Sequence, residues 1–147
     1  MLYISVLVVE DFAPFRSFIL SILGERADLQ VICEVADGLE AVRKAQELKP
    51  DLILLDICLP TLNGIEAARQ IHKLAPESKI IFLTQESSAD VVREALTLGA
   101  WGYVLKTSAA IDLLAAVEAV LEGRQFVSGG LSRHHCTDGG SRPPAVN

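Results

Sequence analysis

The sequence predicts an α/β fold in which a parallel sheet is covered by helices on both of its faces. Five short apolar runs recur along the chain, and each is followed by a segment whose apolar residues have helical spacing. The most apolar of these runs suit strands that are buried on both sides. With 147 residues, of which 50% are hydrophobic, the chain is long enough to bury one core of ordinary size.

The first predicted strand is residues 4–9, with the sequence ISVLVV, and the first predicted helix lies within residues 12–26. Pro14 stands near the start of that helix, where a missing backbone N–H is tolerated. The apolar stripe expected to face the core consists of Phe15, Phe18, Ile19 and Ile22.

The second strand, residues 29–35, is weaker and is expected to be more exposed than the first. Asp37 can cap the helix that follows, and Pro50 marks the point by which this helix has ended. The apolar face of this second helix is expected to consist of Ala41, Val42, Ala45 and Leu48.

The remaining strands are expected at residues 51–55, 79–84 and 102–106, and the remaining helices at 63–75, 88–99 and 108–123. An Asn-Gly turn opens the third helix, and glycines end the fourth and the fifth. Five such units in about 125 residues fit the flavodoxin-like doubly wound (βα)5 fold. That fold has a five-stranded parallel sheet in the order 2-1-3-4-5.

Charge, cysteine usage and the apolar runs exclude several classes of protein. The formal net charge of −6 argues against binding of nucleic acid by the overall field of the chain. No apolar run approaches the ~18 residues of a membrane span, and no basic segment precedes the first run, so we expect a cytoplasmic protein without membrane contact. Cys33, Cys58 and Cys136 share no ligand-like spacing and are interpreted as reduced thiols.

One domain is expected over residues 1–124. Residues 125–147 are interpreted as a linker stub and a disordered tail, because from Gly129 onward Gly, Ser, Arg, His and Pro appear without apolar periodicity.

Five polar residues are expected to converge on one rim of the sheet. Ligands of an open α/β sheet bind beyond the carboxyl ends of its strands, at the switch point between strands 1 and 3. Glu10 and Asp11 end the first strand and Asp56 ends the third, while Thr84 and Lys106 end the fourth and the fifth. Carboxylates suit Mg²⁺, and a lysine with a hydroxyl suits an anion opposite the metal. Each residue alone is ordinary, but together they describe a site for a phosphoryl group on Asp56.

The segments VVEDF, LILLDICLPTLNGIEAAR, IIFLT and GAWGYVLKTS resemble the receiver domain of two-component response regulators, over roughly residues 4–123. The resemblance implies that Asp56 is the phosphoacceptor. It also implies that Mg²⁺ is held by Glu10, Asp11, Asp56 and the main-chain carbonyl of Cys58. The chain would then be no enzyme, apart from taking a phosphoryl group from a donor and losing it again.

The same resemblance implies a switch. Thr84 would turn toward the phosphate, Lys106 would pair with it, and Tyr103 would change rotamer as Thr84 moves. The closing stretch LLAAVEAVLEGRQFVSGGL resembles NarL/FixJ-type regulators, which carry a LuxR-type DNA-binding domain. The implied partners are a sensor histidine kinase, a second copy in a homodimer, and DNA. Because no helix-turn-helix follows residue 128, DNA contact is expected only through an output domain that is missing from this chain.

Several positions depart from the common pattern of that family. Gln85 follows Thr84, where a small residue is usual, and its amide is expected to crowd the phosphate or to hydrogen-bond to it. Cys58 and Glu86 lie two residues past Asp56 and Thr84, at places that tune how fast the acyl phosphate hydrolyses. Trp101 precedes the fifth strand and is expected either to pack against the fourth helix or to be an exposed interface anchor on the face formed by the fourth helix, fifth strand and fifth helix.

Two other functions compete with the phosphorylation switch. One is a phosphorylation-independent dimerisation or interaction module on the same fold, which Gln85 and the missing output domain favour. The other is a phosphatase with an aspartyl-phosphate intermediate, which usually needs a second acid at the position that Cys58 occupies. Neither a P-loop nor a dinucleotide-binding glycine motif is present, and the first strand lacks a flavin phosphate loop after it.

Overall fold

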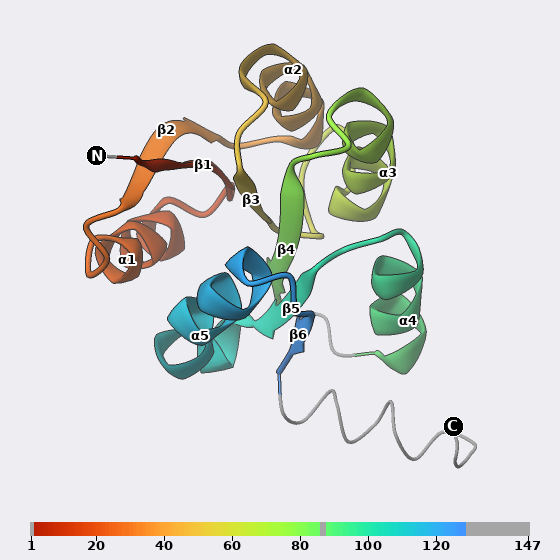
Figure 1. Ribbon diagram of the computed structural model, residues 1–147. Helices are drawn as coiled ribbons and strands as arrows, with labels where there is room; N and C mark the ends of the chain where they lie inside the picture. The colour runs from red at the N-terminus through yellow and green to blue at the C-terminus, as the bar shows by residue number, and fades with distance from the viewer. Residues whose placement is uncertain (1, 86–87, 129–147) are drawn as a thin grey trace.

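The structure, a computed structural model, describes residues 2–85 and 88–128. Within these ranges one parallel sheet has the order β2-β1-β3-β4-β5-β6 (Figure 1). Its strands are β1 (Ile4–Val9), β2 (Leu29–Val35), β3 (Leu52–Leu55), β4 (Lys79–Thr84), β5 (Gly102–Leu105) and β6 (Phe126–Val127). The helices are α1 (Ala13–Leu23), α2 (Gly38–Leu48), α3 (Gly64–Leu74), α4 (Ala89–Thr97) and α5 (Ala109–Leu121), and the 3-10 turn η1 (Lys106–Ser108) joins β5 to α5.

The predicted fold class and the order 2-1-3-4-5 are confirmed, and the structure adds a sixth strand that was not predicted. The short strand β6 pairs in parallel with β5, with Phe126 opposite Gly102 and Val127 opposite Tyr103. Two residues carry no periodicity, so the sequence alone could not distinguish this strand from a linker. The domain boundary at residue 124 stays a prediction, although the chain remains on the sheet past it, and residues 129–147 lie outside the described ranges.

The helices cover both faces of the sheet, α1 and α5 on one face and α2, α3 and α4 on the other (Figure 1). Alternate residues of each central strand point to opposite faces. In β1, Val6 and Val8 pack toward α1 and α5, whereas Leu7 and Val9 pack toward the other three helices. Because both faces are buried, the central strands are apolar at nearly every position, as the sequence indicated.

Two expectations for the core were wrong. Leu48 was expected on the apolar face of α2, but 38% of its surface is exposed. Phe18 was predicted to face the core from α1, but 41% of its surface is exposed. Its ring lies at the rim of the core against Phe15, with 5.7 Å between the ring centroids. Leu23, from the end of the helix, is buried in the core together with Ile19 and Ile22. The buried face of α1 therefore includes Leu23 in place of Phe18.

Asp37 caps α2 as predicted, because its side chain accepts a hydrogen bond of 2.8 Å from the backbone N–H of Glu40. Replacing Asp37 with alanine is expected to lower the free energy of unfolding by about 1 kcal/mol. Ser88 holds the same position at α4 without a capping side-chain bond to the described residues, so Ser88→Ala is the matched control and should change little. Urea unfolding measures both, and equal losses for the two variants would contradict the capping role of Asp37.

Candidate functional site

Three acids meet where β1 and β3 end. These strands pair in parallel, with Val9 opposite Leu55, so the residues that follow them are neighbours. The ligand oxygens of Glu10, Asp11 and Asp56 all lie within 4.8 Å of one another. Glu10 and Asp56 are buried, and Asp11 is exposed. The sequence-predicted acid cluster is therefore present in the geometry.

Lys106 faces two of these acids from the end of β5. Its Nζ donates a hydrogen bond of 3.1 Å to Asp56 Oδ2 and lies 2.8 Å from Glu10 Oε1. Burial alone would lower the pKa of Lys106, but the interactions with Glu10 and Asp56 outweigh it, so the pKa is raised above its ordinary value. The ammonium is therefore charged at neutral pH and neutralises part of the acid cluster.

Glu10 is the most deeply buried acid of the cluster, with 1% of its surface exposed. Burial raises the pKa of Glu10, an effect that its contacts with Lys106 and the backbone N–H of Phe12 oppose and do not cancel. Glu10 Oε2 accepts that Phe12 N–H at 3.0 Å, while Oε1 has an ion pair but no hydrogen-bond partner among the described residues. Three carboxylates, two of them buried, with only the Lys106 ammonium as a described cation beside them, fit a hard cation such as Mg²⁺.

Two residues of α1 that the sequence analysis did not assign to the site support it. The ring of Phe15, expected only as a core residue, has its centroid 4.8 Å from Lys106 Nζ, which is a cation–π contact. Arg16 donates a hydrogen bond of 2.7 Å from Nη1 to the main-chain oxygen of Glu10, and its Nε lies 3.4 Å from Glu34 Oε1. The only signal in the sequence was their place in the first turns of the helix that follows Glu10 and Asp11.

The loop after β3 closes tightly onto Asp56. The backbone N–H of Cys58 donates to Asp56 Oδ1 at 3.3 Å, and that of Gly64 donates to the oxygen of Ile57 at 2.7 Å. A Cβ on Gly64 would lie 2.1 Å from the main-chain oxygen of Asp56, so this close approach requires glycine. Thr61 has φ +65°, a left-handed conformation that is strained for a β-branched residue.

The three residues predicted for the phosphate switch lie on β4 and β5 or at their ends. Thr84, the last residue of β4, is fully buried and pairs with Leu105. Tyr103 is also fully buried, on the face covered by α2, α3 and α4, and its ring lies 6.0 Å from that of Phe82. Gln85 follows Thr84 and is exposed. Glu86, predicted to tune the lifetime of the phosphate, lies outside the described residues.

Trp101 has neighbours on both sides of the sheet. This tryptophan precedes β5 and therefore lies at the amino-terminal edge of the sheet, opposite the acid cluster. It is half-buried and packs against the core of the α1–α5 face, and it also borders a hollow together with Leu98, the C-cap of α4. Lys79 Nζ lies 4.6 Å from the centroid of its ring. Its role as an interface residue stays a prediction.

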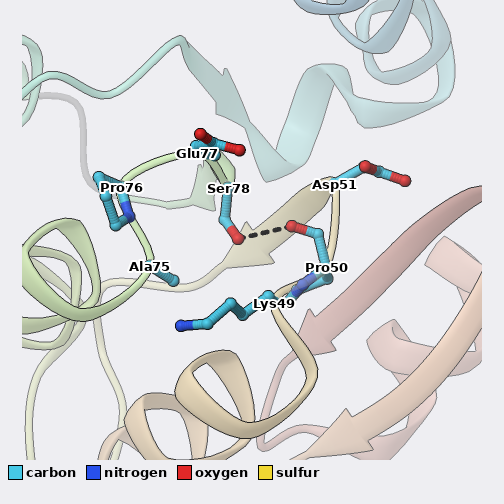
Figure 2. A pocket seen from close by; sticks show the side chains of 7 residues that line it. All are labelled: Lys49, Pro50, Asp51, Ala75, Pro76, Glu77 and Ser78. Atoms are coloured by element: carbon cyan, nitrogen blue, oxygen red, sulfur yellow. Dashed lines mark hydrogen bonds between the residues drawn. The ribbon is translucent and has the colours of Figure 1, made fainter.

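A hollow of the described residues lies at the edge of the sheet opposite the acid cluster. This hollow, at the amino-terminal edge of the sheet, has a volume of about 400 Å³. Figure 2 shows the side chains that line it. Its lining consists of Lys49, Pro50, Asp51, Ala75, Pro76, Glu77 and Ser78. Polar groups there bind neighbouring main chain: Ser78 Oγ donates to the oxygen of Pro50, and Lys49 Nζ donates to that of Leu74 at 3.0 Å. The functional edge is located instead by Lys106, whose ammonium forms ion pairs with the buried carboxylates of Glu10 and Asp56.

An acid cluster opposed by a lysine at the carboxyl edge of a 2-1-3-4-5 sheet is the arrangement of a two-component receiver domain. The family model for the response regulator receiver domain matches residues 6–118, and the chain belongs to this family of signalling domains. The predicted family and fold are thereby confirmed. The structure also shows, in the ranges it describes, no helix both long and apolar enough to cross a membrane.

The relatives are response regulators. The chain is 42% identical over 120 residues to the response regulator protein VraR of Staphylococcus aureus, covering 82% of this chain and 57% of VraR. A LuxR-family two-component response regulator from Aurantimonas sp. SI85-9A1 matches with a TM-score of 0.85 and 31% identity, over 89% of this chain and 94% of that one. The isolated receiver domain of RcsB from Salmonella enterica serovar Typhimurium, solved in the presence of the phosphomimetic BeF3−, matches with a TM-score of 0.84 and 25% identity, over 89% and 97%. The chain thus spans little more than half the length of VraR.

Proposed function

We propose that this domain accepts a phosphoryl group from a sensor histidine kinase on the carboxylate of Asp56. One observation supports this above all others. Asp56 is 4% exposed, yet it lies beside two further acids and accepts a hydrogen bond from the Lys106 ammonium. A structural acid would need only the lysine, whereas a phosphoacceptor needs groups that neutralise an incoming phosphate.

The chemistry is an in-line transfer. An oxygen of Asp56 attacks the phosphorus of the donor phosphohistidine, an O–P bond forms, and the P–N bond breaks with its electron pair left on the imidazole. Lys106 stabilises the charge on the phosphoryl oxygens from its position between Asp56 and Glu10. Later attack by water on the acyl phosphate releases inorganic phosphate and restores the carboxylate. Cys58, Gln85 and Glu86 are proposed to set the rate of that hydrolysis.

Mg²⁺ is the proposed cofactor. Glu10, Asp11 and Asp56 would hold it, together with the main-chain carbonyl of Cys58, and it would supply positive charge to the phosphoryl oxygens. The closeness of the three carboxylates, whose ligand oxygens lie within 4.8 Å of one another, supports this assignment.

Thr84 and Tyr103 are proposed to carry the change of state. Phosphorylation adds up to about two negative charges beside the ends of β4 and β5. Thr84 is proposed to turn toward the phosphate, which would shift the packing of Tyr103 and repopulate a second arrangement of the face formed by α4, β5 and α5. In the full-length protein this face is proposed to mediate dimerisation and to control a DNA-binding output. The LuxR family of the Aurantimonas relative supports that output.

Incubation with acetyl phosphate and Mg²⁺ tests the proposal, with intact mass as the measurement. We expect the gain of one phosphoryl group in the wild type and none in Asp56→Asn. Asp90, an exposed acid of α4, offers the matched control: Asp90→Asn should gain the group as the wild type does. Chelation of Mg²⁺ should prevent the gain. A wild-type protein that gains no mass would contradict the proposal, and dimerisation unaffected by Asp56→Asn would favour the phosphorylation-independent interaction module.

A further inference from the structure

Ser128 directly follows β6 and forms a hydrogen-bonded corner with β5 and α5. Ser128 is 1% exposed. Its backbone N–H donates to the oxygen of Tyr103 at 2.9 Å. Its Oγ accepts the backbone N–H of Leu105 at 3.1 Å and donates to Asp112 Oδ2 at 3.0 Å. One buried residue therefore joins the end of β6 to β5 and to the first turn of α5.

The side chain of Ser128 extends the sheet where the backbone of β6 stops. The N–H of Phe126 donates to Trp101 and that of Ser128 to Tyr103, which is the ladder of a parallel pair. At the next step the hydroxyl of Ser128 accepts the N–H of Leu105. Because Asp112 accepts a hydrogen bond from the same hydroxyl, this buried group both accepts and donates a hydrogen bond.

The corner lies next to Lys106, the lysine proposed to bind the phosphate. Lys106 follows Leu105 directly and opens η1, the turn that leads into α5. Its Nζ must reach Asp56 and Glu10, which lie at the ends of other strands. The position of the Lys106 backbone therefore depends on how the end of β5 is held, and Ser128 holds it on the side of the sheet away from β4. Figure 1 shows β6 beside β5 and near the start of α5.

We propose that Ser128 is a positioning residue for Lys106, and that its corner with Leu105 and Asp112 couples phosphorylation of Asp56 to the short strand β6. The inference rests on the proposed function, because its effect is measured at Asp56. Coupling between two sites is reciprocal. A corner that favours phosphate at Asp56 must itself be stabilised when phosphate is bound.

The first test compares the rate of phosphoryl gain from acetyl phosphate with Mg²⁺, measured by intact mass. We expect Ser128→Ala to react about fivefold more slowly, well short of the ~100-fold that a 1 Å misplacement of a reacting geometry can cost. Asp112→Asn keeps an oxygen that can accept the hydrogen bond from the Ser128 hydroxyl. This variant should therefore react at close to the wild-type rate. Urea unfolding establishes that each variant is folded under the assay conditions. A folded Ser128→Ala protein that reacts at the wild-type rate, however much stability it loses, would show a merely structural serine and overturn the proposal.

If Ser128→Ala does not fold, Asp112→Ala removes the same hydrogen bond from the side of α5 and is expected to react more slowly as well; the wild-type rate in that variant overturns the proposal. Hydrogen exchange of the wild type tests the reciprocal effect. Beryllofluoride with Mg²⁺ should slow exchange of the Leu105 and Ser128 amides, and unchanged exchange despite bound beryllofluoride overturns the coupling. If the wild type gains no phosphoryl group at all, the proposed function fails. If the wild type gains the phosphoryl group and the Ser128 and Asp112 variants react at the same rate, this inference fails and the proposed function stands.

Discussion

Replacing Gly64 with alanine is expected to lower the free energy of unfolding by about 3 kcal/mol and to slow phosphorylation of Asp56. The added Cβ would lie 2.1 Å from the main-chain oxygen of Asp56 and 2.7 Å from the Cα of Ile57. Both are backbone atoms that no side-chain rotation can move, so the loop after β3 must shift. That loop also sets the N–H of Cys58 against the carboxylate of Asp56.

Gly24→Ala is the matched control for this substitution. A Cβ on Gly24 would lie 3.5 Å from the oxygens of Leu20 and Ser21, which is ordinary contact, and the φ of −64° suits alanine. That variant should be unchanged or more stable by about 0.5 kcal/mol, because alanine has less freedom in the unfolded chain. Urea unfolding and intact mass after acetyl phosphate measure both effects. Wild-type stability and wild-type phosphorylation in Gly64→Ala would refute the role assigned to the close approach.

Replacing Lys106 with methionine is expected to destabilise the protein by about 3 kcal/mol in the absence of Mg²⁺. The substitution keeps the length of the side chain but leaves the buried carboxylates of Glu10 and Asp56 facing each other without a cation. Added Mg²⁺ should restore part of the loss, because a cation bound only by the folded state stabilises it. Phosphorylation should be slower even with Mg²⁺, because the phosphoryl oxygens lose the ammonium.

Lys73→Met removes an exposed lysine of α3 and serves as the control. Its stability should be close to that of the wild type, with no added response to Mg²⁺. Chemical unfolding of the two variants with Mg²⁺ and with a chelator gives four comparisons. If Lys106→Met loses no more stability than Lys73→Met in chelator, Lys106 does not neutralise the acid cluster in the way the geometry indicates.

The contact between Asp56 and Lys106, 50 residues apart in the chain, could be anticipated from the sequence. Apolar runs separated by helical segments require parallel strands, and parallel strands bring their carboxyl ends to one edge of the sheet. The acids after β1 and β3 and the lysine after β5 must then lie on the same rim. Side-chain packing plays no part in this, because the order and direction of the strands alone bring these residues to one edge of the sheet.

Contacts between side chains of different elements could not be anticipated in this way. Periodicity shows that Phe15 and Phe18 belong to an apolar stripe, but it does not show that Phe15 lies against Lys106 or that Phe18 stays at the rim. The same holds for Trp101, whose neighbours depend on the direction its ring takes before β5. Such choices depend on the volumes that neighbouring helices leave free.

The sequence by itself determined the parallel sheet, the order of its first five strands, and the rim shared by the acids, Thr84 and Lys106, because strand and helix periods are local properties of the chain. Only the tertiary structure decided that Gly64 closes on Asp56 and that a sixth strand is followed by the buried corner at Ser128. Both depend on distances of a few ångströms between segments far apart in the sequence. A two-residue strand and a single buried hydroxyl have no period, and they become recognisable only once their partners on β5 and α5 are in place.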